Sequence, residues 1–150
     1  MQEISFEQFK GMEFSPYQVY GLDLDYQQHY SIQNYLKNKT AENSLVLLLG
    51  EKNYVVYSSI ASVLSQRNLF LSGEGVSQLN TPEIIRRRNE VSVIKNSENQ
   101  IEINTILKKD NINYIYIYND EVISSMSGLW KNPVLKEVFS NDSGKIYKVN

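Results

Sequence analysis

Apolar residues recur along the chain at two spacings, and the spacing predicts which segments are strands and which are helices. Leu45 to Leu49 is wholly apolar, and Tyr114 to Tyr118 is wholly β-branched or aromatic. A run without polar alternation is typical of a strand that is buried on both faces. Leu69 to Leu71 predicts a third, shorter strand. Leu135 to Phe139 and Lys145 to Val149 lie on either side of a turn signal and predict a C-terminal hairpin.

Apolar residues at helical spacing fill the segments between these strands. The predicted helices run from Asp23 or Asp25 to Lys37, from Tyr54 to Gln66, from Pro82 past Ile94, and through Ile103 to about Asp110. Thr81 is a good N-cap for the third helix, with Pro82 at its first helical position. The predicted inward faces of the second and third helices are Val56, Ile60, Val63 and Leu64, and Ile84, Ile85, Val91 and Ile94.

Strands that alternate with helices imply right-handed crossovers and a largely parallel sheet. We therefore predict an α/β fold, a small three-layer sandwich whose mostly parallel sheet has an antiparallel C-terminal hairpin at its edge. Residues 23–150 are expected to form a single α/β domain, and residues 1–22 an N-terminal segment or linker. Tyr114, Tyr116 and Tyr118 share one face of their strand, so we expect them to pack under a helix.

Composition narrows the class of protein. The 150 residues suffice for one domain with its own core. Lys and Arg number 15 against 17 Asp and Glu, which argues against a nucleic-acid binder held by a general positive field. The absence of Cys excludes thiolate zinc sites, and the single His excludes any site with two imidazoles. We assign no metal site and expect no cofactor. No apolar run reaches the roughly 18–20 residues of a membrane helix.

Two loops follow predicted strands, where open α/β sheets place their ligands. Lys52 and Asn53 lie in the first loop, and Gly73, Glu74 and Gly75 form the second. Backbone amides and a lysine at such a turn can meet an anion. Neither loop has the spacing of a phosphate-binding motif. An ordinary turn is therefore the competing interpretation of both.

His29 and the run from Arg86 to Arg88 are the remaining candidates. His29 leans toward the apolar side of its helix, so it is either a general base or a partly buried structural residue. Three consecutive helical arginines spread over about 200° and cannot all grip one phosphate. Arg86, Arg87 and Arg88 are candidates for contact with anionic lipid or phosphate, against the plainer interpretation of a solvated face. Glu83 and Glu90 are spaced to pair with Arg87.

The order of segments is similar to that of a known family of domains. A helix from Tyr26 to Thr40 precedes the strand Ser44 to Leu48, and the segments Ser62 to Glu74, Arg86 to Arg88, Leu107 to Ile117 and Val138 to Val149 follow in order. Together they resemble the soluble C-terminal domain of multi-pass GT-C-type membrane glycosyltransferases, over roughly Asp25 to Val149.

The resemblance implies an extracytoplasmic, non-catalytic accessory domain. In that family, catalysis belongs to an acidic residue of the membrane part, and a polyprenyl-phosphate sugar is the donor. No position of this chain matches that acidic residue, so no catalytic residue is assigned. The implied partners are the membrane-embedded portion of a parent protein and a sugar or polyprenyl-phosphate donor or acceptor, with no nucleic acid.

Two alternatives from other classes stay open. The first is a small stand-alone α/β enzyme or nucleotide- or sugar-binding protein, cytoplasmic in this case, that uses Lys52, Asn53, Glu74 and His29 at the strand ends. The second is a protein–protein interaction module that binds a partner through the Tyr-rich N-terminal helix.

Overall fold

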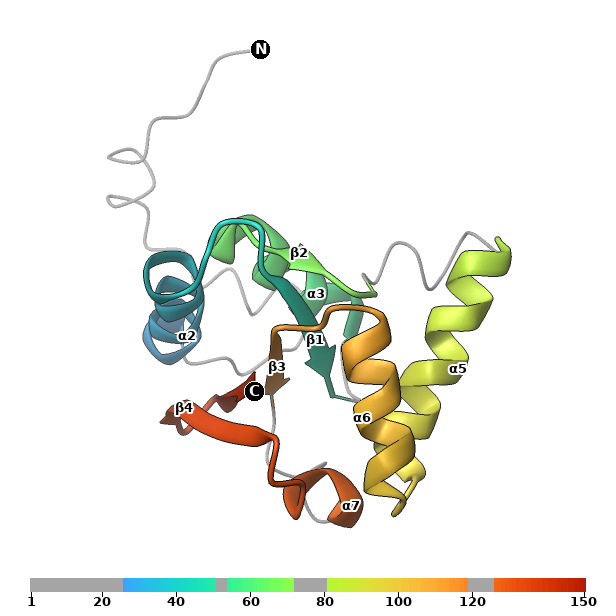
Figure 1. Cartoon of the computed structure of the whole chain (residues 1–150). Coiled ribbons are helices and arrows are strands. Elements are labelled where there is room, and N and C mark those ends of the chain that lie inside the picture. The colour runs from blue at the N-terminus through green and yellow to red at the C-terminus, as the bar shows by residue number, and fades with distance from the viewer. Residues whose placement is uncertain (1–25, 51–53, 72–80, 119–125) are drawn as a thin grey trace.

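The computed structural model describes residues 26–50, 54–71, 81–118 and 126–150 (Figure 1). The described elements alternate between helices and strands up to β2, continue with two helices before β3, and end in a hairpin. In chain order they are α2 (Tyr26–Lys39), β1 (Leu45–Leu49), α3 (Tyr54–Ser65), β2 (Asn68–Leu69), α5 (Pro82–Asn96), α6 (Gln100–Lys109), β3 (Tyr114–Tyr118), α7 (Ser127–Trp130), β4 (Leu135–Asn141) and β5 (Gly144–Val149).

The strands form one five-stranded sheet in the order β2-β1-β3-β5-β4. β1 pairs in parallel with β2 and with β3, whereas β5 pairs antiparallel with β3 and with β4. The prediction of an α/β fold with an antiparallel hairpin at its C-terminal edge is therefore confirmed. β2 is shorter than predicted, although the amide of Phe70 still donates to the carbonyl of Val46 at 2.8 Å.

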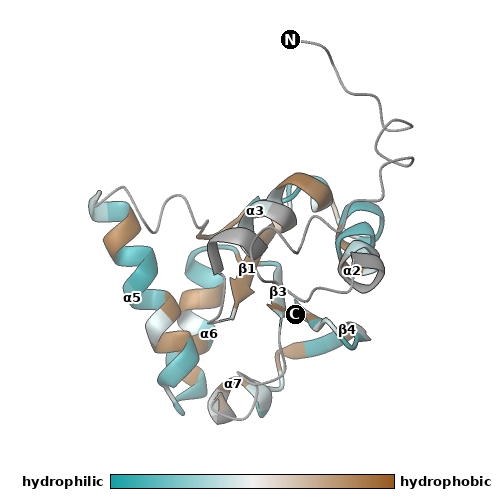
Figure 2. Cartoon of the chain, turned by 180° about the vertical axis from the view of Figure 1, so that it is seen from behind, coloured by the Kyte–Doolittle hydropathy of each residue, from teal (hydrophilic) through white to brown (hydrophobic). Residues whose placement is uncertain are grey.

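Side chains of the two central strands alternate between two hydrophobic cores. Leu47 and Leu49 of β1 face the core formed with α5, α6 and α7. Val46 and Leu48 face the other core, formed with α2 and α3. Figure 1 shows α5 and α6 together on one side of β1, with α2 on the other side, and Figure 2 shows β1 as hydrophobic throughout its length. The sheet is thus the middle layer of three, as predicted.

The two helical connections run in opposite directions along the sheet. α3 links β1 to β2 on one edge, and α5 and α6 link β2 back across β1 to β3. Because such crossovers are right-handed, reversing their direction places the two sets of helices on opposite faces of the sheet. The carboxyl ends of β1 and β3 therefore lie at a topological switch point, where open α/β sheets bind ligands.

The tyrosines of β3 pack as the alternation predicts. Tyr116 and Tyr118 are fully buried in the core under α2 and α3, and Tyr114 is partly buried against it. The ring of Tyr35 in α2 lies 5.0 Å from that of Phe139 in β4, which extends the same core to the edge of the sheet.

Two predicted core positions are wrong. Val63 is 72% exposed and Ile85 is 45% exposed. Among the described side chains of α3, the buried ones are Ser58, Ala61 and Ser65. The predicted core positions Val56 and Ile60 lie outside the described side chains. In α5 only Ile94 is fully buried, so the apolar stripe of that helix is narrower than its sequence suggests.

A buried arginine joins the ends of two helices. Arg67 is 7% exposed and donates to the hydroxyl and the carbonyl of Thr40, each at 2.9 Å, and to the carbonyl of Lys37. It also donates to the carbonyl of Gln66 at 3.0 Å. These carbonyls follow the last turns of α2 and α3, where the helix dipoles place partial negative charge. The guanidinium thus supplies both charge and donors to the two C-termini.

The first prediction concerns the central strand. Leu47 is fully buried, so Leu47→Ala should lower the free energy of unfolding by about 2–5 kcal/mol. Val63→Ala is the control, because its exposed side chain should cost under about 0.5 kcal/mol. Urea denaturation followed by circular dichroism measures both. A loss under about 1 kcal/mol for Leu47→Ala would contradict a central strand here.

The second prediction concerns Arg67. Arg67→Met should cost about 3 kcal/mol or more, because it leaves several carbonyls at the ends of α2 and α3 without donors. The stability of Arg67→Lys should lie between those of the wild type and Arg67→Met, since an ammonium keeps the charge but lacks the planar set of donors of a guanidinium. Lys108→Met on the exposed side of α6 is the matched control. Equal stability of Arg67→Met and the wild type would refute a role in holding the two helices.

Candidate functional site

Most loop candidates fall outside the part of the chain that the structure describes. Lys52 and Asn53 lie in the segment 51–53, and Gly73, Glu74 and Gly75 lie in the segment 72–80. His29 belongs to α2, but its side chain is also outside the described part. Their roles therefore remain predictions.

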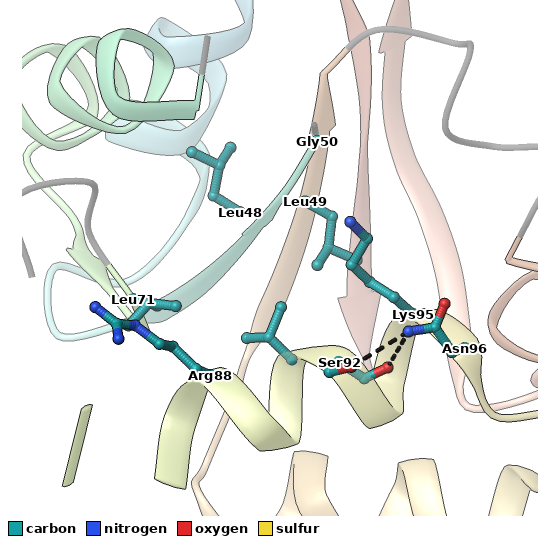
Figure 3. A pocket seen from close by; sticks show the side chains of 9 residues that line it. Leu48, Leu49, Gly50, Leu71, Arg88, Ser92, Lys95 and Asn96 are labelled. Carbon is teal, nitrogen blue, oxygen red and sulfur yellow. Dashed lines mark hydrogen bonds between the residues drawn. The ribbon is translucent and has the colours of Figure 1, made fainter. Parts of the chain in front are cut away.

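A pocket lies beside the two strand ends from which those loops start. It has a volume of about 310 Å³ and lies between the carboxyl ends of β1 and β2 and one face of α5 (Figure 3). Its lining combines apolar residues of the strands with mainly polar residues of the helix: Leu48, Leu49, Gly50, Leu71, Arg88, Val91, Ser92, Lys95 and Asn96. Of the predicted candidates, the described structure places Arg88 in this site.

The described lining of the pocket is cationic. Arg88 and Lys95 are partly buried and lie two turns apart on α5, with Ser92 between them. Asn96 donates from its side-chain amide to the carbonyl of Ser92 at 2.8 Å and to its hydroxyl at 3.3 Å. No Asp, Glu or His is among the described residues of the lining. The arrangement suits the binding of an anion and lacks a described pair of groups for acid–base chemistry.

A glycine and a tyrosine close the other side of the switch point. A Cβ atom at Gly50 would lie 2.0 Å from Cζ of Tyr118, so only glycine leaves room for this ring. Tyr118 is fully buried in the core under α2 and α3. Its ring therefore fills that face of the sheet at the end of β1, and the pocket lies on the α5 face.

The three arginines of the run reach different neighbours, although Arg86 and Arg87 share Glu83. Arg86 pairs with Glu83 at 2.8 Å, Glu90 at 2.6 Å and Asp110 at 2.9 Å. Two of these acids lie on α5 itself, and Asp110 follows α6, so the arginine ties the two helices together. Its side chain is 32% exposed, which differs from the solvated face expected from the sequence.

Arg87 connects α5 to the end of β2. It donates to the carbonyl of Phe70 at 2.7 Å, and its guanidinium lies 5.0 Å from the centre of the Phe70 ring. It also pairs with Glu83 at 2.7 Å, as predicted. The predicted pairing of Glu90 with Arg87 is wrong, because Glu90 binds Arg86 and Lys109 instead. The reason is that α6 lies on the Arg86 side of the helix.

Sequence reasoning missed the remaining polar residues of the pocket. Ser92, Lys95 and Asn96 share one face of α5 with Arg88, at spacings of four, seven and eight residues. That stripe was visible in the sequence. Its position against the ends of β1 and β2 was not, because it depends on how α5 crosses the sheet.

The described residues form neither a candidate metal site nor a candidate membrane span. No group of three His, Asp or Glu side chains in this part of the chain is placed to hold a metal ion. Among the helices described, none is both long and apolar enough to cross a membrane.

The structure is similar to the crystal structure of the C-terminal globular domain of an oligosaccharyltransferase from Archaeoglobus fulgidus. The TM-score is 0.52 at 11% sequence identity, over 80% of this chain and 95% of that domain. The two domains share a fold. The resemblance predicted from segment order, to the C-terminal domain of a membrane glycosyltransferase, is thus confirmed at the level of the fold. No family model matches the sequence, and no curated protein matches it significantly.

The third prediction concerns the acid at the start of α5. Hydrogen bonds from Arg86 and then Arg87 lower the pKa of Glu83 to about 2. Because its pKa in the folded state lies below the ordinary value of 4.5, the ionised form stabilises the fold above that pH. This contribution should be lost as the pH falls toward 2.

Carboxyl carbon shifts in an NMR titration measure this pKa directly. In the double variant Arg86→Met, Arg87→Met the pKa of Glu83 should rise toward its ordinary range, whereas Lys108→Met should leave it unchanged. A Glu83 titration that is the same in the double variant as in the wild type would disprove the assignment.

Proposed function

We propose that this chain is a non-catalytic accessory domain of a membrane glycosyltransferase-like protein. The observation that carries the proposal is the shared fold with the C-terminal globular domain of an oligosaccharyltransferase, of which 95% is matched. That domain is one part of an enzyme, and by analogy this chain serves a larger glycosyl-transfer system.

The described pocket supports binding in preference to catalysis. Glycosyl chemistry by protein side chains needs two carboxyl groups about 5–9.5 Å apart. The described lining of the pocket has two cations, a hydroxyl and an amide, but no carboxylate. A domain of this kind contributes by positioning a substrate or a neighbouring part of the enzyme.

We further propose that its partner is the membrane-embedded portion of the same system, on the extracytoplasmic side. The fold similarity to an oligosaccharyltransferase domain supports such a partner. The partner surface is not assigned to particular residues, since the described exposed apolar side chains are scattered over four helices: Tyr30 on α2, Val63 on α3, Ile85 on α5 and Ile101 on α6.

The fourth prediction separates accessory from catalytic function. The purified chain should neither transfer nor hydrolyse sugar when incubated with polyprenyl-phosphate sugars or sugar nucleotides. The triple variant Asp23→Ala, Asp25→Ala, Glu74→Ala should behave identically. Turnover that the wild type shows and this variant loses would place an active site on the chain and overturn the proposal.

A chromosomal deletion tests the positive side of the proposal. Removing the codons for residues 26–150 should reduce sugar transfer from polyprenyl-phosphate donors in isolated membranes, while Val63→Ala in the same gene should preserve it. The amounts of the membrane enzymes are compared by immunoblot. Transfer at the wild-type rate after the deletion would show that the domain serves no such system.

A further inference from the structure

We propose that the pocket between β1, β2 and α5 binds the phosphate or pyrophosphate group of a small-molecule ligand. The proposal goes beyond the accessory role and is supported by the pocket alone. The accessory role does not require this site, and the site does not require the accessory role. Each proposal can therefore fail without the other.

The position of the pocket favours a ligand. Open α/β sheets bind their ligands outside the carboxyl ends of the strands, next to the switch point. Gly50 directly follows β1 at that point, and Leu71 lies two residues after the end of β2, the neighbouring strand. The volume of about 310 Å³ is at the lower end of the range for small-molecule sites. Tyr118 closes the opposite face of the sheet, so a ligand at this edge has its place on the α5 side.

The two cations approach the pocket from its two ends. Figure 3 shows the guanidinium of Arg88 beside Leu71, while Lys95 extends from the last turns of α5 toward Leu49. Seven helical residues span about 10.5 Å along the axis. Two long cationic side chains at that spacing can converge on one phosphate or contact the two phosphates of a pyrophosphate. Arginine offers a planar fork and lysine a compact charge, and both bind phosphate oxygens.

Ser92 adds a neutral donor between the cations. The side-chain amide of Asn96 donates to the hydroxyl oxygen of Ser92 at 3.3 Å, so the oxygen of Ser92 acts as an acceptor. The hydroxyl hydrogen can then rotate toward the pocket and donate to a ligand oxygen. This geometry gives one helix face a sequence of cation, hydroxyl and cation.

The described acidic residues at the contact between α5 and α6 do not line the pocket. Glu90 and Asp110, which are 12% and 10% exposed, pair with Arg86. Lys109 of α6 pairs with Glu90 as well. These pairs compensate the acids at the contact between α5 and α6, while Arg88 and Lys95 line the pocket. The face of α5 toward α6 thus carries these ion pairs, and the face toward the pocket carries Arg88 and Lys95.

The apolar walls suit the rest of the ligand. Leu49 is buried and Val91 is partly buried at the pocket, and Leu71 is 7% exposed. Such walls lower the local dielectric and strengthen the attraction between the cations and a phosphate. The phosphate group can come from a soluble sugar nucleotide or from a lipid-linked sugar, and both present the same chemistry to Arg88 and Lys95.

The fifth prediction is tested by calorimetric titration of the 150-residue chain with inorganic pyrophosphate. We expect saturable binding that weakens as the salt concentration rises. Lys95→Glu and Arg88→Gln should each reduce the affinity by about tenfold or more, equivalent to about 1.4 kcal/mol. Lys108→Glu on α6 makes the same charge change as Lys95→Glu away from the pocket and should retain the affinity.

Thermal melting without ligand verifies that each variant is folded. Wild-type protein that is folded and shows no binding at millimolar pyrophosphate would overturn the proposal. An equal loss in Lys108→Glu and Lys95→Glu would also overturn it, because the binding would then reflect net charge alone.

Two further titrations distinguish the sources of the phosphate. A sugar nucleotide that binds more tightly than pyrophosphate, with the same dependence on Lys95, indicates a soluble ligand. Tighter binding of farnesyl phosphate than of pyrophosphate, measured below its critical micelle concentration and with the same dependence on Lys95, indicates a lipid-linked ligand. If both bind more weakly than pyrophosphate in every variant, the pocket does not accept the body of a phosphorylated ligand, and the proposal is wrong.

Discussion

β1 has no polar position, so the fold must exclude water from both of its faces. Leu47 and Leu49 need cover on one face, and Val46 and Leu48 need it on the other. Helices on a single side of the sheet cannot meet this demand. The chain therefore leaves β1 toward one edge through α3 and returns across it through α5 and α6. The three layers and the switch point follow from this burial, because right-handed crossovers in opposite directions reach opposite faces.

The pocket between β1, β2 and α5 results from the same three-layer arrangement. At the end of β1 the two faces of the sheet differ. On the face covered by α2 and α3, Tyr118 packs against Gly50, whereas a cavity lies between the sheet and α5 on the other face. α5 buries few apolar side chains and is anchored instead through its arginines, which bind Phe70, Glu90 and Asp110. A helix held by its polar side chains can present others, such as Lys95, to a pocket without losing its place on the sheet.

The accessory role and the phosphate site have different foundations. The first rests on a fold shared with a domain of a glycosyl-transferring enzyme at 11% identity, which carries no information about individual residues. The second rests on the side chains of one pocket and needs no relative. Both proposals assign binding and positioning to the chain, and the described lining of the pocket offers cations and donors but no carboxylate.

The sequence by itself determined the elements whose signals are local. The unbroken apolar runs predicted β1 and β3, and Thr81 with Pro82 predicted the start of α5, where Thr81 accepts a hydrogen bond from Ile84 at 3.3 Å. Alternation placed the tyrosines of β3 on one face. These properties depend on neighbours within a few residues, so a single chain displays them.

Only the tertiary structure decided which helix face meets which neighbour. Val63 and Ile85 were expected inside, but both are exposed, and α5 turns Arg86 toward α6 and Arg87 toward β2. The link that Arg67 makes to the end of α2 has no local signal, since Thr40 and Lys37 lie 27 and 30 residues away in the sequence. The pocket is of the same kind, because Gly50, Leu71 and Lys95 meet only when three elements cross at one sheet edge. The spacing of apolar residues and the capping of a helix depend on nearby residues. The angle at which a helix crosses a sheet depends on all the side chains packed between the helix and the sheet.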